Sequence, residues 1–337
     1  MRKINILIIL GVVVVCLLLV GQNISAEESY PEKPITIVVP WSVGGVTDLT
    51  VRSIQPILQE ILDAPVVVNN MPGGSSAVGS EFVANAKPDG YTLLFATNEL
   101  AIFQVMGLSD LSFDDFNPIM ILTMGLPSFC VHADSQWETI EEFLEDAKKR
   151  PGEILAAHSG LGASSHINAM MLGAAGIEMK LVGYNGGGPA VTAVLQKEAD
   201  VTFQLFTEVT EYIASGDLRL LTTFTNERTD FYPDVPALGE VLPEIKSFLP
   251  WGIFNSPCTP KGTPDEVNEV LEKAFIEAIK DPRWIKTVTE NVKALNLGYT
   301  GEAAIDFINK WRSTTGWMLY EGGLAKTSPA DFDIPKP

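Results

Sequence analysis

Residues 36–52 read TIVVPWSVGGVTDLTVR, and this stretch decides the class of fold. A short β-branched run, Ile37 to Val39, ends at Pro40, and a helix-like pattern begins at Thr47 after two glycines. An unpatterned apolar run of this length predicts a strand that is buried on both faces. The free N–H groups and the dipole at the start of the following helix favour a negatively charged group. The stretch therefore predicts a strand, an anion-binding loop and a helix, in that order.

Strand-like and helix-like segments alternate along the rest of the chain. Apolar runs predict strands at 65–69, 92–96, 153–157, 180–183, 200–205 and 218–224. The helix that follows the opening loop carries one apolar stripe, formed by Val51, Ile54, Leu58 and Ile61. Pro56 lies inside this helix and is expected to bend or shorten it. The alternation predicts an α/β protein with mostly parallel sheets flanked by helices.

Two later helices carry start signals. Thr139 and Glu142 are spaced as a capping box, in which each side chain accepts from the other residue's backbone N–H. Thr263, Pro264 and Glu266 predict a second capped start with a proline in the first helical position. A final helix is expected at about 302–320.

The first 26 residues are typical of a cleavable secretory signal. Arg2 and Lys3 precede an apolar run from about Ile6 to Val20, and a small residue, Ala26, precedes two acidic ones. An uncleaved anchor would need roughly 20 apolar residues, against about 15 here. A lipid anchor on Cys16 is disfavoured because leucines follow that cysteine. We expect export and cleavage near Ala26, and a location in the periplasm, or on the cell surface in a host with a single membrane.

The charge of the expected mature chain is strongly negative. Removing residues 1–26 takes away two basic residues and no acidic one, so that 21 basic residues face 42 acidic ones, a formal charge of −21. Nucleic-acid binding depends on lysine and arginine, so this balance argues against it. Cys130 and Cys258 remain, and they are compatible either with a disulfide or with two buried thiols. About 310 residues suggest two domains.

Three glycine-rich loops share one position in the pattern, after a strand and before a helix: 40–48, 158–166 and 184–189. Any single loop could be only a tight turn, but the three together predict a shared cleft at the carboxyl edges of the strands. None contains a lysine or arginine, as a phosphate-binding P-loop would, and the dinucleotide fingerprint fails because GLGASS ends in serine. A carboxylate held by N–H and hydroxyl donors is therefore the expected anion.

A catalytic interpretation finds few candidate residues. Ser164 lies between His158 and His166, but the G-x-S-x-G elbow of serine hydrolases is absent. His132 is expected on the surface of a strand, and His166 is expected to orient the loop. The ligands of a metal site would be clustered, and the sequence shows no such cluster. We expect no catalysis, no metal and no cofactor.

Longer segments resemble the extracytoplasmic solute-binding proteins of tripartite tricarboxylate transporters, the Bug or TctC family. The resemblance runs from about Tyr30 to Trp317 and rests on YPEKPITIVVPWSVGGVTD, VVVNNMPGGSSAVGSEFVANAKPDGYTLLFAT, GYNGGGPAVTAVLQKEADVTF, IASGDLRLL and PDVPALGE taken together. It implies a two-domain type II periplasmic-binding-protein fold, a Venus flytrap that closes over its ligand. Family ligands are small carboxylates, including citrate-like and dicarboxylic acids, acidic amino acids and some aromatic acids.

The resemblance also implies the ligand contacts, since the first glycine loop and a second-domain loop of the family hold one carboxylate, partly through water. Carried over by position, the ligand-binding residues are Trp41, Ser42, Val43, Gly44, Gly45, Val46, Thr47, Asp48, Asn98, Ser159, Gly162, Ala163, Ser164, His166, Tyr184 and Gln204.

The sequence departs from the family pattern at four informative positions. Ala163 replaces a frequent Thr or Ser, Asn185 a frequent Lys and Gln204 a frequent Asp. Trp41 stands where Phe or Tyr is commoner and offers a broader stacking face. These departures predict a ligand with one well-held carboxylate and a less polar, for example aromatic, body.

These expectations define a monomeric binding protein that delivers a small carboxylate to membrane permease subunits. The predicted domains are 27–125 plus 255–337, and 126–254, because the strand–helix pattern restarts near Gly125 and a capped helix begins after Asn255. One alternative is a ligand-sensing module for a membrane receptor, which has the same fold and ligand. The other is a secreted serine hydrolase that uses Ser164 with His158 or His166.

Overall fold

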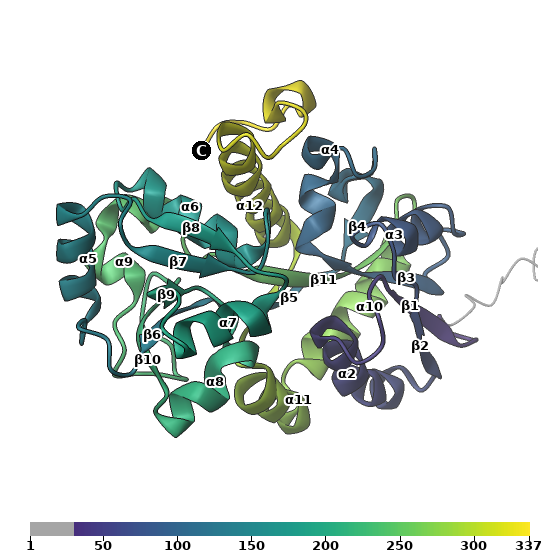
Figure 1. The fold of residues 1–337 in the computed structure, drawn as a ribbon. Coiled ribbons are helices and arrows are strands. Elements are labelled where there is room, and N and C mark those ends of the chain that lie inside the picture. The colour runs from purple at the N-terminus through teal and green to yellow at the C-terminus, as the bar shows by residue number, and fades with distance from the viewer. Residues whose placement is uncertain (1–29) are drawn as a thin grey trace, which may run out of the picture.

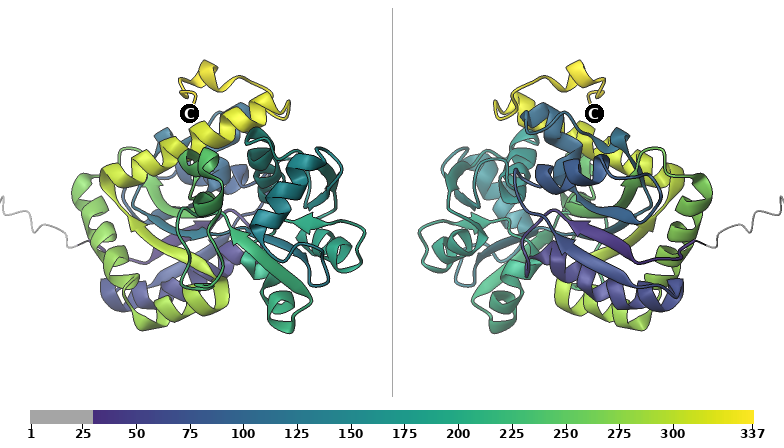
Figure 2. Two further views of the ribbon diagram at one scale, coloured as in Figure 1. Left: turned by 90° about the vertical axis from the view of Figure 1, so that its left-hand side faces the viewer. Right: turned by 90° about the vertical axis from the view of Figure 1, so that its right-hand side faces the viewer.

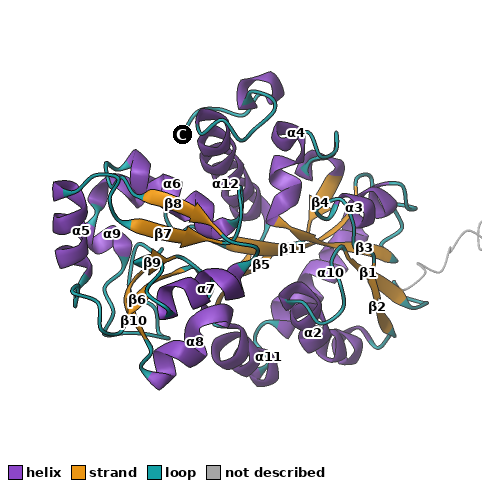
Figure 3. Ribbon diagram, in the orientation of Figure 1, coloured by secondary structure: helices purple, strands orange, loops and turns teal. Residues whose placement is uncertain are grey.

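The computed structural model describes residues 30–337, so the predicted signal segment 1–26 lies outside the described residues. Within that part of the chain, the strands form two sheets with helices packed against them (Figures 1 and 3). In the same part, none of the helices is long and apolar enough to cross a membrane.

The first sheet has the strand order β12-β5-β11-β3-β1-β2, and β4 pairs with β11 outside this path. Its strands are β1 (Ile35–Val39), β2 (Val66–Asn70), β3 (Thr92–Thr97), β4 (Phe116–Pro118), β5 (Ile121–Gly125), β11 (Ile253–Pro260) and β12 (Ala294–Tyr299). The second sheet has the order β10-β6-β9-β7-β8. Its strands are β6 (Ser128–His132), β7 (Leu155–His158), β8 (Lys180–Gly183), β9 (Val201–Thr202) and β10 (Leu218–Thr223).

The α-helices fill the connections between these strands. They are α2 (Val46–Leu62), α3 (Ala77–Ala84), α4 (Phe103–Met106), α5 (Ile140–Lys149), α6 (Ser164–Ala174), α7 (Gly187–Leu195), α8 (Phe206–Ser215), α9 (Leu238–Val241), α10 (Asp265–Ala278), α11 (Pro282–Lys286) and α12 (Gly301–Glu321). The predicted strand and helix positions are therefore confirmed to within a few residues, although β9 is only two residues long.

Strand direction differs from the prediction in one respect. The strand–helix–strand units are parallel as predicted, with β1 beside β2 and β3, and β7 beside β8 and β9. In contrast, β11 and β12 run antiparallel to their partners, as do β6 and β10. The sheets are therefore mixed rather than mostly parallel. Of the antiparallel strands, β6 and β11 enter from the other sheet, so that no crossover helix within one sheet fixes their direction.

Helix α2 follows its apolar stripe. Val51, Ile54 and Leu58 are buried against the first sheet, as predicted. The helix continues without interruption to Leu62, so Pro56 does not shorten it, contrary to one of the two expectations for this residue.

The two predicted capping boxes have different outcomes. The Thr139 hydroxyl accepts from the Glu142 N–H, and the Glu142 carboxylate accepts from the Thr139 N–H, as predicted. The second box is wrong, because α10 has Pro264 as its N-cap and no side-chain cap. The Thr263 hydroxyl donates to the Pro260 carbonyl, which takes it away from the start of the helix.

The chain passes between the two sheets twice, after β5 and again before β11. At these crossings Gly252 lies directly against the backbone of Gly125, so closely that a Cβ on Gly252 would be 2.3 Å from the Gly125 oxygen. Long helix α12 contacts both α6 and the short helix η1 (Asn98–Ile102), and Figure 2 shows it running along one side of the molecule. The domain limits drawn from the sequence stay a prediction.

The two cysteines lie on different sheets, Cys130 on β6 and Cys258 on β11. Both are free and completely buried, and burial raises the pKa of each thiol to about 12. Of the two alternatives left open by the sequence, the structure shows two buried thiols.

Candidate ligand-binding site

The first glycine loop leaves β1 at Val39 and enters α2 at Val46. The N-cap of α2 is Gly45, which has extended backbone and no side chain to accept a hydrogen bond from the first turn. The structure describes the whole of this loop, and in it the N–H groups of Val46 and Thr47 donate to no backbone carbonyl. First-turn N–H groups cannot bond within the helix. These two donors, with the Thr47 hydroxyl, are available to an anion.

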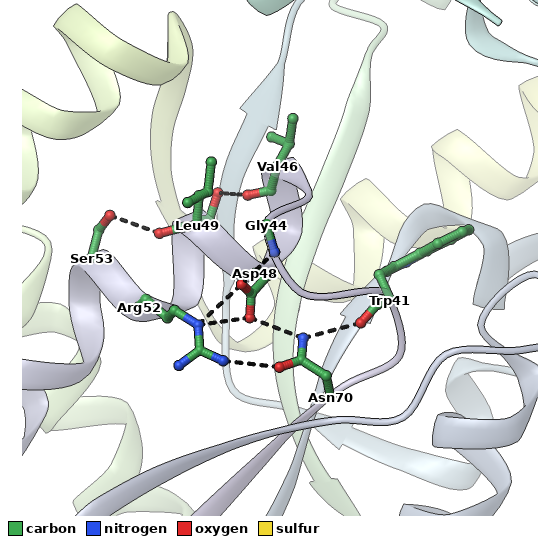
Figure 4. Close-up of polar contacts among 9 residues, drawn as sticks. Trp41, Gly44, Val46, Asp48, Leu49, Arg52, Ser53 and Asn70 are labelled. Carbon is green, nitrogen blue, oxygen red and sulfur yellow. Dashed lines mark hydrogen bonds and ion pairs between the residues drawn. The ribbon is translucent and has the colours of Figure 1, made fainter.

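A buried carboxylate holds the loop in shape. Asp48 is 1% exposed and accepts from the Gly44 N–H at 2.8 Å, from Arg52 Nε at 2.9 Å and from Asn70 Nδ2 at 2.9 Å (Figure 4). Burial alone would raise the pKa of Asp48, but these three donors outweigh it and hold the pKa below its usual value. Gly44 and Asp48, both predicted to contact the ligand, are thus bonded to each other. Asp48 supports the loop as an ionised acceptor.

Trp41 is held at both ends. Its indole N–H donates to Thr97 Oγ1 at 3.1 Å, and its carbonyl accepts from Asn70 Nδ2 at 3.0 Å. The ring extends away from the Asp48–Arg52–Asn70 group (Figure 4) and is only half-buried. Asn98, at the end of β3, follows Thr97 directly and is buried. The ends of three neighbouring strands therefore form the first half of the site.

Sequence reasoning missed Asn70, Arg52 and Thr97. Asn70 ends the apolar run of β2 with a polar amide, and this signal could have been used. The parallel register pairs Val39 with Asn70, so the amide lies beside the residues that follow β1. Arg52 stands four residues after Asp48, the spacing of a helical ion pair.

The second glycine loop connects β7 to α6. The N-cap of α6 is Ala163, which has extended backbone and no side-chain cap, as Gly45 does in α2. Ser165 is fully buried, and its hydroxyl accepts from the Ser159 N–H at 2.9 Å and lies 2.8 Å from the Ser159 hydroxyl. Ser159 is thus fixed by a residue that the prediction did not include.

The two histidines of this loop stack on each other. The rings of His158 and His166 are 4.5 Å apart at an angle of 24°. Nδ1 of His166 accepts from the Gly162 N–H at 3.0 Å, which places the proton of the neutral ring on Nε2. Burial, with a smaller contribution from His158, lowers the pKa of His166 to about 4. Within the described residues, Ser164 makes no hydrogen bond to either histidine, so the hydrolase hypothesis gains no support.

The pKa of His166 predicts a pH dependence of stability. Between about pH 4 and the ordinary histidine value of 6.5, the unfolded chain binds more protons than the folded chain. Protonation of the unfolded chain therefore lowers the free energy of unfolding very little above pH 6.5, and by about 3 kcal/mol as the pH falls to 4. Urea unfolding from pH 7 to 4.5 measures it. His166→Asn, which keeps an acceptor for Gly162, should show a shallower pH dependence, and an unchanged one would contradict the assignment.

The ends of β7, β8 and β9 lie side by side. Tyr184, after β8, donates its N–H to the His158 carbonyl at 2.8 Å. Gln204, after β9, is 1% exposed and donates from Nε2 to Thr202 Oγ1, which in turn donates to the Ala157 carbonyl. The second half of the site is therefore a single edge of the second sheet.

The two halves are separate but adjacent. In the described chain, no hydrogen bond joins residues 41–48 or Asn98 to the second glycine loop, Tyr184 or Gln204. A small pocket does lie between the sheets, lined among others by Val46, Thr123, Leu205, Phe206, Asn255 and Lys293. It places the start of α2 near the start of α8. No group of three or more His, Cys, Asp or Glu able to hold a metal occurs among the described residues.

Comparison with known proteins gives a consistent result. Residues 50–302 match the model of the tripartite tricarboxylate transporter family receptor. A UPF0065 protein in the tcbD–tcbE intergenic region of Pseudomonas sp. strain P51 is 32% identical over 294 residues, which are 86% of this chain and 85% of that protein.

Two solved structures are similar in fold. One is a TctC solute-binding protein from Polaromonas without ligand, with a TM-score of 0.77 and 27% identity, covering 87% of this chain and 100% of that one. The other is the periplasmic binding protein BugD, with a TM-score of 0.67 and 27% identity, covering 88% of this chain and 100% of that one. Both match nearly the whole described chain.

Proposed function

Because this chain belongs to the tripartite tricarboxylate transporter receptor family, we propose that it captures a small organic acid between its two sheets and delivers it to the membrane subunits of such a transporter. Proteins of this family are periplasmic receptors that bind small carboxylates and work with a membrane transporter. Their role is binding and not catalysis. The particular acid, the particular membrane subunits and export of this chain to the periplasm are parts of the proposal.

One observation carries the proposal: two helices begin without side-chain caps at the carboxyl edges of separate sheets. Gly45 precedes α2 and Ala163 precedes α6, and neither residue can satisfy the first-turn donors of its helix. An anion between the two helix starts would satisfy donors from both sheets. No lysine or arginine lies in either loop, so the charge would be met by backbone dipoles, which suits a carboxylate.

The ligand's other end would face Trp41. The indole is fixed by Thr97 and Asn70, and its ring remains half-exposed beside the loop. A rigid aromatic face favours an apolar or aromatic group over a second carboxylate. We therefore include in the proposal a ligand with one carboxylate bound by the loops and a less polar body on Trp41.

The proposal also includes two domains that close on the ligand, 27–125 plus 255–337, and 126–254. The two crossings support these limits, since β5 ends at Gly125 and β11 begins at Ile253. A ligand bound at both sheet edges would favour the closed arrangement, because it contacts both halves only there.

A thermal-shift screen of the purified mature protein against organic acids tests the proposal. The panel contains benzoate, longer aliphatic monocarboxylates, succinate and citrate. At a ligand concentration about 100 times Kd, binding adds about 2.7 kcal/mol to the free energy of unfolding. We expect the largest increase in Tm from acids with an apolar body. If no carboxylate raises Tm, the binding function is wrong.

Trp41→Ala is expected to change selectivity. Loss of the ring should weaken binding of an aromatic acid by tenfold or more, because an aromatic contact contributes about 0.5–1.5 kcal/mol beyond the buried area. Binding of succinate should change by less than about threefold. Isothermal titration calorimetry with both acids measures the ratio.

Trp317→Ala is the matched control. Trp317 is also half-buried, and its indole N–H donates to the Ile334 carbonyl, near the C-terminus. This variant should leave both affinities unchanged. If the wild type prefers citrate and Trp41→Ala leaves every affinity unchanged, the stacking argument fails.

Delivery to a transporter needs a separate measurement. Uptake of the labelled acid by the host should fall when the gene for this protein is deleted and return when it is restored. Binding of the acid in vitro with normal uptake in the deletion strain would favour the sensing alternative.

A further inference from the structure

The tips of the two glycine loops carry exposed aliphatic side chains. Val43 is 71% exposed and Leu161 is 76% exposed, the two largest fractions among the exposed large hydrophobic residues of the described chain. Gly44 follows Val43 with φ +83°, and Gly160 and Gly162 flank Leu161 with φ +125° and +77°. These left-handed glycines turn the backbone so that each tip projects from its loop.

The two tips follow strands of different sheets, Val43 after β1 and Leu161 after β7. The pocket between the sheets brings Val46, three residues after Val43, close to Leu205. Leu205 follows β9, and β9 is paired with β7 so that Thr202 lies opposite Ala157. The second loop, with Leu161 at its tip, starts directly after β7. The pocket lining and the strand pairing thus connect the two loops across the boundary between the sheets.

The hydrogen bonds that hold each loop in shape do not cover these two side chains, which stay exposed to solvent. The first loop is fixed by Asp48, and the second by Ser165 and His166, and none of these contacts involves Val43 or Leu161. A large aliphatic side chain in water has an unfavourable hydration free energy that burial removes. Two of them, one on a loop of each sheet, would lose exposed surface if the loops closed on a ligand.

We propose that Val43 and Leu161 are specificity-determining residues that bury the apolar body of the bound acid when the cleft closes. This inference rests on the proposed function and deepens it, since it names the part of the ligand that the loop tips recognise. Covering the ligand also excludes water from the loop N–H groups, which strengthens their hydrogen bonds to the carboxylate. Recognition should therefore increase with the apolar surface of the acid.

The test measures affinities for an aliphatic monocarboxylate series from acetate to octanoate, with benzoate added. Val43→Ser and Leu161→Ser should each weaken octanoate and benzoate binding by about tenfold and leave acetate binding within about twofold. The double variant should lose most of the dependence of affinity on chain length. Because both side chains are exposed, Tm without ligand should stay within about 2 °C of the wild type.

Two exposed hydrophobic residues elsewhere provide matched controls. Leu108 follows a left-handed glycine and is 41% exposed, and Val78 on α3 is 48% exposed. Leu108→Ser and Val78→Ser should bind every acid as the wild type does.

The outcomes separate this inference from the proposed function. If the wild type binds acids and the loop-tip variants bind the whole series equally well, the inference is overturned and the binding function stands. Normal affinity combined with lost uptake would likewise overturn it, and would assign the tips to docking on the membrane subunits. If the wild type binds no acid, the proposed function itself fails.

Discussion

Asp48→Ala is expected to lower the free energy of unfolding by about 3 kcal/mol and to weaken ligand binding by tenfold or more. The carboxylate is buried and ionised, and a hydrogen bond to a charged group contributes about 1.5–3 kcal/mol. Its loss removes the acceptor of the Gly44 N–H, of Arg52 Nε and of one Asn70 Nδ2 bond, while Arg52 keeps its bond to Asn70 Oδ1. Arg52 is 42% exposed, so water can solvate its guanidinium in the variant. The expected loss in the free energy of unfolding is therefore near the lower end of the sum of the lost hydrogen bonds. Urea unfolding and calorimetric titration measure the two effects.

Glu60→Ala is the control for this prediction. Glu60 lies on the same helix and also pairs with an arginine, Arg283, but its side chain is 61% exposed. An exposed ion pair contributes little to stability because water and salt screen it, so this variant should fold and bind nearly as the wild type does. Equal stability of the Asp48 and Glu60 variants would show that the buried carboxylate does not organise the loop.

The second large effect is expected from Gly252→Ala. A Cβ at this position would lie 2.3 Å from the Gly125 oxygen and 3.0 Å from Met124 Cγ, so the two chain crossings would have to move apart. Overpacking of this kind costs about 1–3 kcal/mol, and contact with backbone places this site at the upper end. Unfolding in urea gives the stability, and the thermal-shift screen shows whether ligand binding survives.

Gly173→Ala is the matched substitution. Gly173 lies in α6, and a Cβ there would meet no atom within 4 Å. Alanine in a helix is favoured over glycine by up to about 1 kcal/mol, so this variant should be as stable as the wild type or more so. A Gly252→Ala protein with wild-type stability would mean that the crossings adjust freely, which would contradict the close packing of Gly125 and Gly252.

Much of the fold could be predicted from the sequence because it depends on local patterns. The β-branched run of β1, the apolar stripe of α2 and the Thr139 capping box each lie within about a dozen consecutive residues. The antiparallel pairing of β11 could not be predicted in this way, since its partners β3 and β5 lie far away in the sequence. The predicted capping box of α10 was wrong because the Thr263 hydroxyl donates to the Pro260 carbonyl and does not accept from the helix.

In the candidate site too, features set by neighbouring residues could be predicted and contacts between distant residues could not. Sequence alone determined the glycine loops, their place between a strand and a helix and the absence of lysine and arginine in those loops, because each is a property of adjacent residues. Only the tertiary structure decided that Asp48 accepts from Asn70, 22 residues away, and that the Gly44 N–H donates to Asp48. It also decided the stacking of His158 on His166 and the exposure of Val43 and Leu161. The physical reason is that a side chain's partner and solvation depend on strand register and sheet packing, which bring distant residues together.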